Sequence, residues 1–185
     1  MDVLNKLSVE ERTLIVSLPY RAGLWVSQSD SAGGDEADEK EHTALANIVD
    51  GFSQNVFGSE LLQYIMNETV GRKDEWPVWE EASGDVLRDC ARALDVLRGV
   101  VDEKDVSAYS MRLMEIGEAV ALAFREYEEG SALEQFRVYV SYLFMKLKRR
   151  LGKRPSKSFD QFLSISARER KALGKLAKAL GTTYA

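Results

Sequence analysis

The chain has 185 residues, 45% of them hydrophobic, with 3 Pro and 13 Gly, a composition that excludes a disordered or fibrous protein. Its single Cys and single His exclude an internal disulfide and a four-ligand zinc site built from Cys and His. The net charge of −5 conceals an asymmetry, because residues 146–178 hold twelve Lys and Arg against two acidic residues, a net of +10, while the rest of the chain carries −15.

Apolar residues recur at spacings of three and four along almost the whole chain, and no strand-like alternation persists. The sequence therefore predicts an all-α fold, a compact bundle of about seven helices whose apolar stripes are buried against one another. The expected helices span residues 9–28, 35–56, 59–72, 84–101, 103–127, 132–151 and 166–180.

The first expected helix has a clear start and an interruption. Ser8 and Glu11 have the spacing of a capping box, in which hydroxyl and carboxylate satisfy open backbone donors of the first turn. The segment that follows is apolar on most sides, which predicts a central helix. Pro19 predicts a kink, or a break with a restart, because proline lacks the donor of a helical hydrogen bond.

The polar loop at residues 29–34 lies within the densest cluster of carboxylates, six acidic residues between positions 30 and 41. Calcium and magnesium prefer oxygen ligands, and a turn followed by a helix start can direct several of them at one ion. Asp35 and Glu39 would share a helix face, with Asp30 folding over from the loop. The spacing does not fit an EF-hand, because Asp35 occupies the position that requires glycine. The alternative is that these residues complement the helix macrodipole.

The sequence gives little support for catalysis. Glu39 and His42 have the spacing of di-iron carboxylate bundles, but those sites use two such pairs and the chain has one His. We expect His42 to be a partly exposed helix residue. Cys90 lies on an apolar stripe, which predicts a small buried side chain.

Carboxylate pairs such as Glu80 with Glu81, and Glu128 with Glu129, are typical of solvated surface in so acidic a chain. The prediction is that the protein is not an enzyme.

Later boundaries also follow from helix-end chemistry. Pro77 suits the first position of a short separate turn at residues 77–82. Two further serine–glutamate pairs fit capping boxes, and two glycines follow helical runs as expected C-caps. These residues are Ser131 with Glu134, Ser166 with Glu169, Gly152 and Gly181.

The charge distribution predicts two regions, an acidic helical domain at residues 1–151 and a basic linker with a C-terminal helix at residues 152–185. The C-terminal helix either docks on the same domain or is loosely attached. The basic residues 146–155 favour either an acidic protein partner or docking onto the acidic body of the same chain. They have few aromatic neighbours for base stacking, which disfavours nucleic acid, and an anionic membrane surface is a weaker alternative.

No stretch is apolar for long enough to cross a bilayer, since the longest covers residues 119–124. The first six residues also lack the apolar core of a secretory signal. We therefore expect a cytoplasmic protein without a transmembrane segment.

Two segments carry a resemblance to a known family. Leu-Pro-Tyr-Arg-Ala-Gly at residues 18–23, followed by the acidic cluster, resembles the first half of a TerB-like tellurite-resistance domain. Ile-Gly-Glu-Ala-Val-Ala-Leu-Ala at residues 116–123, followed by Glu126 and Glu134, is similar to its second half. The family is all-helical with an internal pseudo-repeat, and its members are associated with divalent-metal binding and stress response in bacteria.

The resemblance implies two acidic sets that bind a divalent metal ion of the calcium or magnesium class. The first set is Asp30, Asp35, Glu36 and Glu39, and the second is Glu126 and Glu134. The chain departs from the family pattern at the glycine pair 33–34, which lengthens the first turn, and in a second turn that reads Glu-Tyr-Glu-Glu-Gly. A metal-free protein-interaction module, acting through the acidic body or the basic C-terminal segment, is the alternative function.

Overall fold

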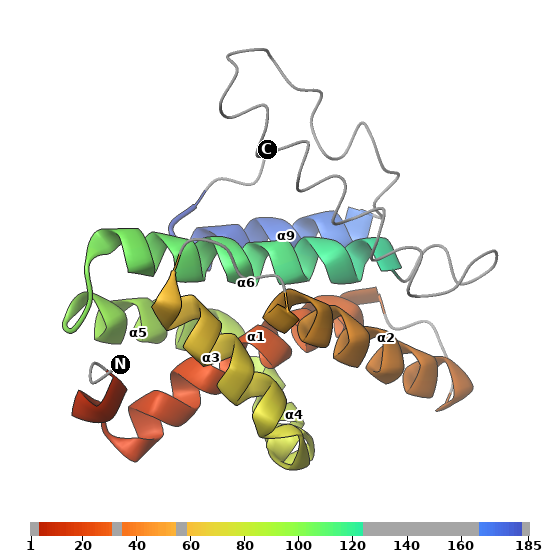
Figure 1. Cartoon of the computed structure of the whole chain (residues 1–185). Helices are drawn as coiled ribbons and strands as arrows, with labels where there is room; N and C mark the ends of the chain where they lie inside the picture. Colours follow the sequence, from red (N-terminus) through yellow and green to blue (C-terminus); the bar gives the residue numbers. More distant parts are fainter. Residues whose placement is uncertain (1–3, 31–34, 55–58, 124–166, 183–185) are drawn as a thin grey trace.

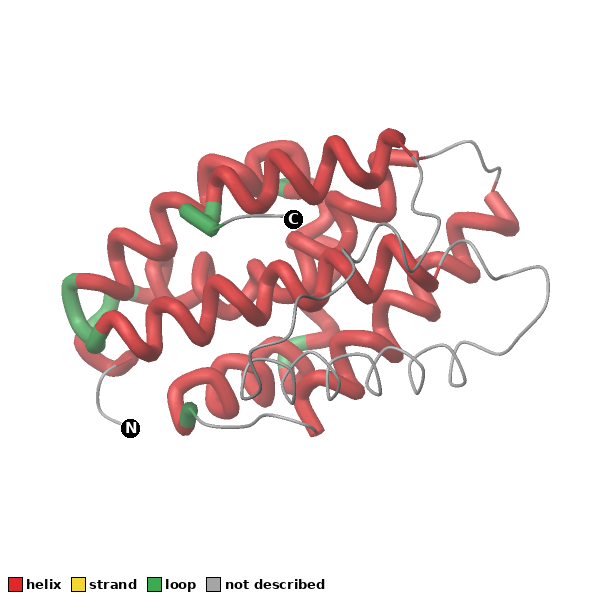
Figure 2. Tube along the Cα trace, turned by 90° about the horizontal axis from the view of Figure 1, so that it is seen from above, coloured by secondary structure: helices red, strands yellow, loops and turns green. Residues whose placement is uncertain are grey.

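A computed structural model describes residues 4–30, 35–54, 59–123 and 167–182, giving only the backbone at residue 30 and at residues 35–41. Within these ranges the fold is all-α, a compact helical bundle without strands (Figures 1 and 2). The helices are α1 (Val9–Ser27), α2 (Asp35–Gln54), α3 (Glu60–Gly71), α4 (Trp76–Glu81), α5 (Val86–Arg98), α6 (Glu103–Ala123) and α9 (Ala167–Ala179). Short 3-10 turns are η1 (Leu4–Lys6), η2 (Gln28–Asp30), η3 (Lys73–Glu75) and η4 (Ser83–Asp85).

The predicted helices agree closely with the described ones. Five of the expected starts lie within one residue of the observed start, and the predicted turn after Pro77 is the short helix α4. The helix expected at 84–101 is shorter at both ends, because η4 precedes it and it ends at Arg98. The helix expected at 132–151, the capping box at Ser131 and the C-cap at Gly152 lie outside the described residues.

Helix α1 is the centre of the bundle and contacts each of the six other helices described. Its start is the predicted capping box, with the Ser8 hydroxyl accepting from the Glu11 amide and the Glu11 carboxylate accepting from the Ser8 amide. Every residue from Leu14 to Leu24 is buried. The prediction of a central helix is therefore confirmed.

Pro19 lies inside α1, which continues through it, so the break considered from the sequence does not occur. Proline leaves the carbonyl four residues earlier, that of Ile15, without its helical donor. The hydroxyl of Tyr109, from α6, donates to this Ile15 oxygen at 2.8 Å. On the adjacent carbonyl of Val16, the Thr69 hydroxyl from α3 donates at 2.6 Å. Neighbouring helices thus satisfy the backbone around the proline.

Two glycines allow close packing around α1 and α6. A Cβ at Gly23 would lie 2.5 Å from a Leu45 methyl and 3.1 Å from an Ile116 methyl. A Cβ at Gly117 would lie 3.1 to 3.3 Å from side chains of Leu176, Leu173 and Val26. Both glycines therefore occupy positions where a larger residue would force neighbouring side chains to move.

Helix α9 packs on α5, α6 and α1, and Figure 1 shows it alongside α6. Its apolar face is buried, with Leu173 and Leu176 fully inaccessible. The helix ends in a Schellman motif, with Gly181 at φ 62° and the Thr182 amide donating to the Ala177 carbonyl at 2.9 Å. The predicted C-cap at Gly181 is confirmed. No helix within the described ranges is long and apolar enough to cross a membrane.

Candidate functional site

The first predicted acidic set lies at the junction between α1 and α2. Asp30 ends η2, while Asp35, Glu36 and Glu39 fall within the first five residues of α2. The side chains of these four residues are outside the described part of the structure. The described backbone thus places Asp30 before, and the other three residues after, a connection of four residues.

The second predicted acidic set cannot be compared in this way. Glu126 and Glu134 both lie outside the described residues, as do the basic residues 146–155. Among the side chains that the structure does describe, no group of three or more His, Cys, Asp or Glu residues could hold a metal ion.

His42 is the first residue of α2 whose side chain the structure describes. Its side chain is 43% exposed, which confirms the prediction of a partly exposed helix residue. Its Nδ1 atom lies 3.3 Å from Oε1 of Glu80, on α4. The imidazole therefore joins two helices that are far apart in the sequence.

Glu80 is only in part the solvated surface carboxylate that was expected, because it also contacts two other side chains. Its side chain is one-third exposed, and its Oε1 accepts a hydrogen bond from the Tyr20 hydroxyl at 2.5 Å in addition to facing His42. The reason is the amphipathic packing of α4, in which Trp76 and Trp79 are buried. This packing brings Glu80 to α1, whereas Glu81 remains exposed.

Tyr20, on the buried side of the Glu80 carboxylate, fixes its position with a hydrogen bond. The tyrosine is 2% exposed and its ring stacks on Trp76, with centroids 4.1 Å apart and planes at 21°. Burial, followed by the hydrogen bond to Glu80, raises the pKa of Tyr20 far above its ordinary range. The phenol is therefore a neutral donor at physiological pH.

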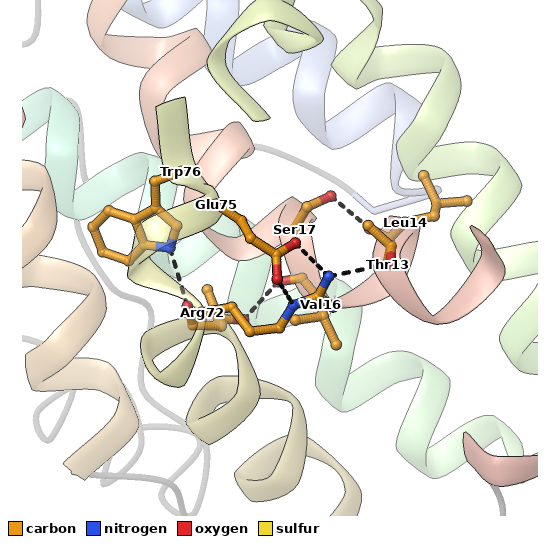
Figure 3. Close-up of polar contacts among 8 residues, drawn as sticks. Thr13, Leu14, Val16, Ser17, Arg72, Glu75 and Trp76 are labelled. Atoms are coloured by element: carbon orange, nitrogen blue, oxygen red, sulfur yellow. Dashed lines mark hydrogen bonds and ion pairs between the residues drawn. The ribbon is translucent and has the colours of Figure 1, made fainter. Parts of the chain in front are cut away.

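A second set of contacts holds the segment before α4 against α1 and α3 (Figure 3). Arg72 donates to both carboxylate oxygens of Glu75, at 2.7 and 2.5 Å, and to the Thr13 hydroxyl at 3.3 Å. The Trp76 indole donates to the Thr69 carbonyl at 3.0 Å. The hydrogen bonds from Arg72 lower the pKa of Glu75. These contacts set the start of α4 and therefore the place of Glu80.

Arg21, a buried arginine of α1, contacts the segment that follows α4. Arg21 donates to Asp89 of α5 at 2.6 Å and to the carbonyl of Ala82, and its Nε atom is buried without a hydrogen-bond partner. The side chains of Arg21 and Asp89 are 5% and 13% exposed. This ion pair joins α1 to α5 and to the turn after α4.

Cys90 is buried, as the apolar stripe predicts. Burial raises the pKa of its thiol to about 12, so the free thiolate that nucleophilic attack needs is scarce near neutral pH.

The described part of the basic C-terminal region is α9. Its buried face carries Ala172, Leu173, Leu176, Ala177 and Leu180, and its opposite face is basic. Arg168, Lys171, Lys175 and Lys178 recur at spacings of three and four and are exposed, as is Arg170. Arg168, Lys171, Lys175 and Lys178 form one stripe along the solvent side of the helix, which we call the α9 basic stripe.

Comparison of the chain with protein-family models, with curated proteins and with solved structures finds no match in any of the three. The TerB-like resemblance therefore stays a prediction from the sequence. Reasoning from the sequence did not identify the contact among Tyr20, His42 and Glu80, although the Glu39–His42 spacing drew attention to the same face of α2.

Proposed function

We propose that the chain is a non-enzymatic TerB-like helical domain that binds a divalent cation of the calcium or magnesium class at the α1–α2 turn. Its role would be in bacterial stress response, through sequestration or sensing of the ion. The observation that carries the proposal is where the two elements on either side of this connection end and begin. Asp30 ends the last turn before it, and α2 begins at Asp35, so the first acidic set lies on both sides of a four-residue connection.

The physical argument is that a hard cation needs several oxygen ligands from a short, adjustable segment. Asp35 and Glu39 are four residues apart on α2 and share a face, with Glu36 adjacent. The proposal assigns Asp30, Asp35, Glu36 and Glu39 as ligands. Glu126 and Glu134 are assigned, from the resemblance alone, to a second set.

The test is thermal unfolding of the full chain with and without millimolar Ca²⁺ or Mg²⁺. An ion that binds only the folded protein raises the melting temperature as its concentration rises. The double variant Asp30→Asn with Glu39→Gln is expected to lose the rise. The control is Asp95→Asn, an exposed carboxylate of α5 paired with Arg98, which should keep it. Unchanged melting with both ions would refute the proposal.

A second candidate function is favoured by the α9 basic stripe. A metal-free interaction module would use this stripe to bind an acidic protein, since its cations face solvent while the opposite face of α9 is buried in the bundle. A low-salt binding assay with polyglutamate would detect it. The triple variant Lys171→Gln, Lys175→Gln and Lys178→Gln should weaken binding, and equal binding by this variant would exclude the stripe.

The polyglutamate-binding test uses substitutions in α9 instead of a deletion of the C-terminal helix. Leu173 and Leu176 of α9 are fully buried, so deleting the C-terminal helix would expose the core of the rest of the protein. Loss of binding after such a deletion would have two explanations, whereas the lysine variants leave the packed face unchanged.

A further inference from the structure

Outside the acidic turn, an imidazole and a carboxylate from different helices face each other at the surface. Nδ1 of His42 and Oε1 of Glu80 are 3.3 Å apart, and the two side chains are 43% and 33% exposed. Both are therefore accessible to a dissolved ion. We call them the His42–Glu80 pair.

The separation of the two atoms matches a shared metal ion. Zinc binds histidine nitrogen and carboxylate oxygen at roughly 2.0 to 2.2 Å, and two such ligands at a tetrahedral angle are about 3.3 Å apart. An ion could therefore be accommodated between the two atoms with little rearrangement of either helix.

We propose that the His42–Glu80 pair binds a first-row transition-metal ion of the zinc or cobalt type, with water in the remaining positions. An imidazole ligand favours Zn²⁺ or Co²⁺, while Ca²⁺ and Mg²⁺ favour oxygen ligands alone. The site is thus distinct in its ion class from the calcium or magnesium site proposed at the α1–α2 turn. It uses none of the carboxylates assigned to that turn, so either proposal can fail without the other.

The surroundings of Glu80 resemble the outer shell of a metal site. Ligating carboxylates are commonly held by a hydrogen bond from a second residue, which fixes their orientation. Tyr20 supplies this hydrogen bond at 2.5 Å, and its own ring is fixed by burial and by stacking on Trp76. Tyr20 is therefore assigned as a positioning residue for Glu80.

The local charge favours a cation as well. Residues 35–41, which lead directly into His42 on α2, contain five acidic residues and one lysine. A concentration of negative charge raises the local concentration of cations and the rate at which they reach a nearby site.

The competing interpretation is a simple ion pair or hydrogen bond between His42 and Glu80 that binds no metal. The two differ in a direct measurement. Calorimetric titration of the untagged full chain with Zn²⁺, and visible absorption with Co²⁺, should detect one bound ion in the proposed case. If neither ion binds, the pair is only a helix contact and the proposal is wrong.

Variants locate the ion. His42→Gln and Glu80→Gln should each weaken Zn²⁺ binding at least tenfold, while Glu81→Gln, the exposed neighbour, should leave it unchanged. Tyr20→Phe should weaken binding about tenfold through the loss of its hydrogen bond. Circular dichroism checks that each variant is folded, and His42→Gln alters an exposed side chain that is not part of the core. Wild-type affinity in folded His42→Gln would overturn the proposal.

Two further readouts separate this site from others. Zn²⁺ affinity should fall in acid, because protons compete with the ion for a ligating nitrogen, and unchanged affinity there would contradict a histidine ligand. The double variant Asp30→Asn with Glu39→Gln should retain Zn²⁺ binding. If it loses Zn²⁺ binding while His42→Gln keeps it, the ion belongs to the acidic turn and the proposal fails.

Discussion

A buried cation with one carboxylate partner illustrates how single residues stabilise this bundle. Arg21 is on the central helix and 4% exposed, and its charge is compensated by Asp89 and by the Ala82 carbonyl. Removing one member of a buried pair leaves an uncompensated charge, which costs far more than breaking a surface pair. Asp89 therefore stabilises the fold by compensating the buried charge of Arg21, and this effect is larger than that of its contribution to the net charge of the chain.

Asp89→Ala is expected to lower the free energy of unfolding by about 3 to 5 kcal/mol, because Arg21 would lose its counter-charge in the interior. The matched control is Asp85→Ala, four residues earlier in the chain, whose ion pair with Arg88 has side chains 58% and 74% exposed. The control should cost under about 1 kcal/mol. Urea unfolding of both variants measures the difference, and equal costs would contradict the burial argument.

The burial of Cys90 can be tested by the reactivity of its thiol and by the pH dependence of the free energy of unfolding. With its pKa raised to about 12, the native thiol should react with Ellman's reagent at pH 8 far more slowly than the unfolded chain. An unfolded thiol ionises from near pH 9, so its contribution to stability is intact below that pH and is lost as the pH rises toward 12. Cys90→Ala should therefore lose less stability than the wild type between pH 8 and 10.5. Fast native labelling would refute the burial.

At the scale of helices, the local sequence predicted where helices begin and end, whereas the contacts between helices depend on tertiary packing. The capping box at Ser8 and the left-handed Gly181 depend on neighbours within five residues, so the sequence was sufficient to place them. The contact of Glu80 with Tyr20 spans 60 positions and depends on how α4 docks on α1. No spacing rule covers such a contact, which explains why the pair with His42 was not predicted.

Pro19 shows the same limit within one helix. The sequence predicted a kink or a break at this position, and the break does not occur: Tyr109 of α6 replaces the missing donor to the Ile15 carbonyl, and α1 continues. The carbonyl that proline leaves without a helical donor is thus satisfied by a hydrogen bond from another element. A tyrosine 94 positions from Ile15 in the sequence could not be matched to this carbonyl from the sequence alone, because the match depends on how the two helices pack.

Tyr109→Phe should lower the free energy of unfolding by about 1 to 3 kcal/mol, since it leaves a buried carbonyl without a donor. The effect should shrink in a Pro19→Ala background, where the residue 19 amide can donate to Ile15 within the helix. A double-mutant cycle measured by urea unfolding gives the coupling between the two positions. Strict additivity would show that Tyr109 does not compensate for the proline.

At the scale of the whole molecule, the bundle depends on how closely its central helices approach. Gly23 on α1 faces Ile116 of α6, and Gly117 on α6 faces Val26 of α1, so the two helices use one glycine each at the same interface. Gly117 also faces Leu173 and Leu176 of α9. The C-terminal helix is therefore packed into the same core as the N-terminal helix, although 139 residues lie between the end of α1 at Ser27 and the start of α9 at Ala167.

Because of this packing, the effect of a Gly→Ala substitution on the free energy of unfolding depends on the position of the glycine. Alanine favours a helix over glycine by about 1 kcal/mol, so an unhindered Gly174→Ala in α9, with no atom within 4 Å of the new Cβ, should stabilise the protein by that amount. At Gly23 the new methyl would meet Leu45 at 2.5 Å and two further side chains of α6, and overpacking of this kind costs about 1 to 3 kcal/mol. Because Leu45 is fully buried, it has little space to move away. We therefore expect Gly23→Ala to lower the urea midpoint and Gly174→Ala to raise it, and a Gly23→Ala variant more stable than the wild type would show that α1 and α6 are not closely packed at this point.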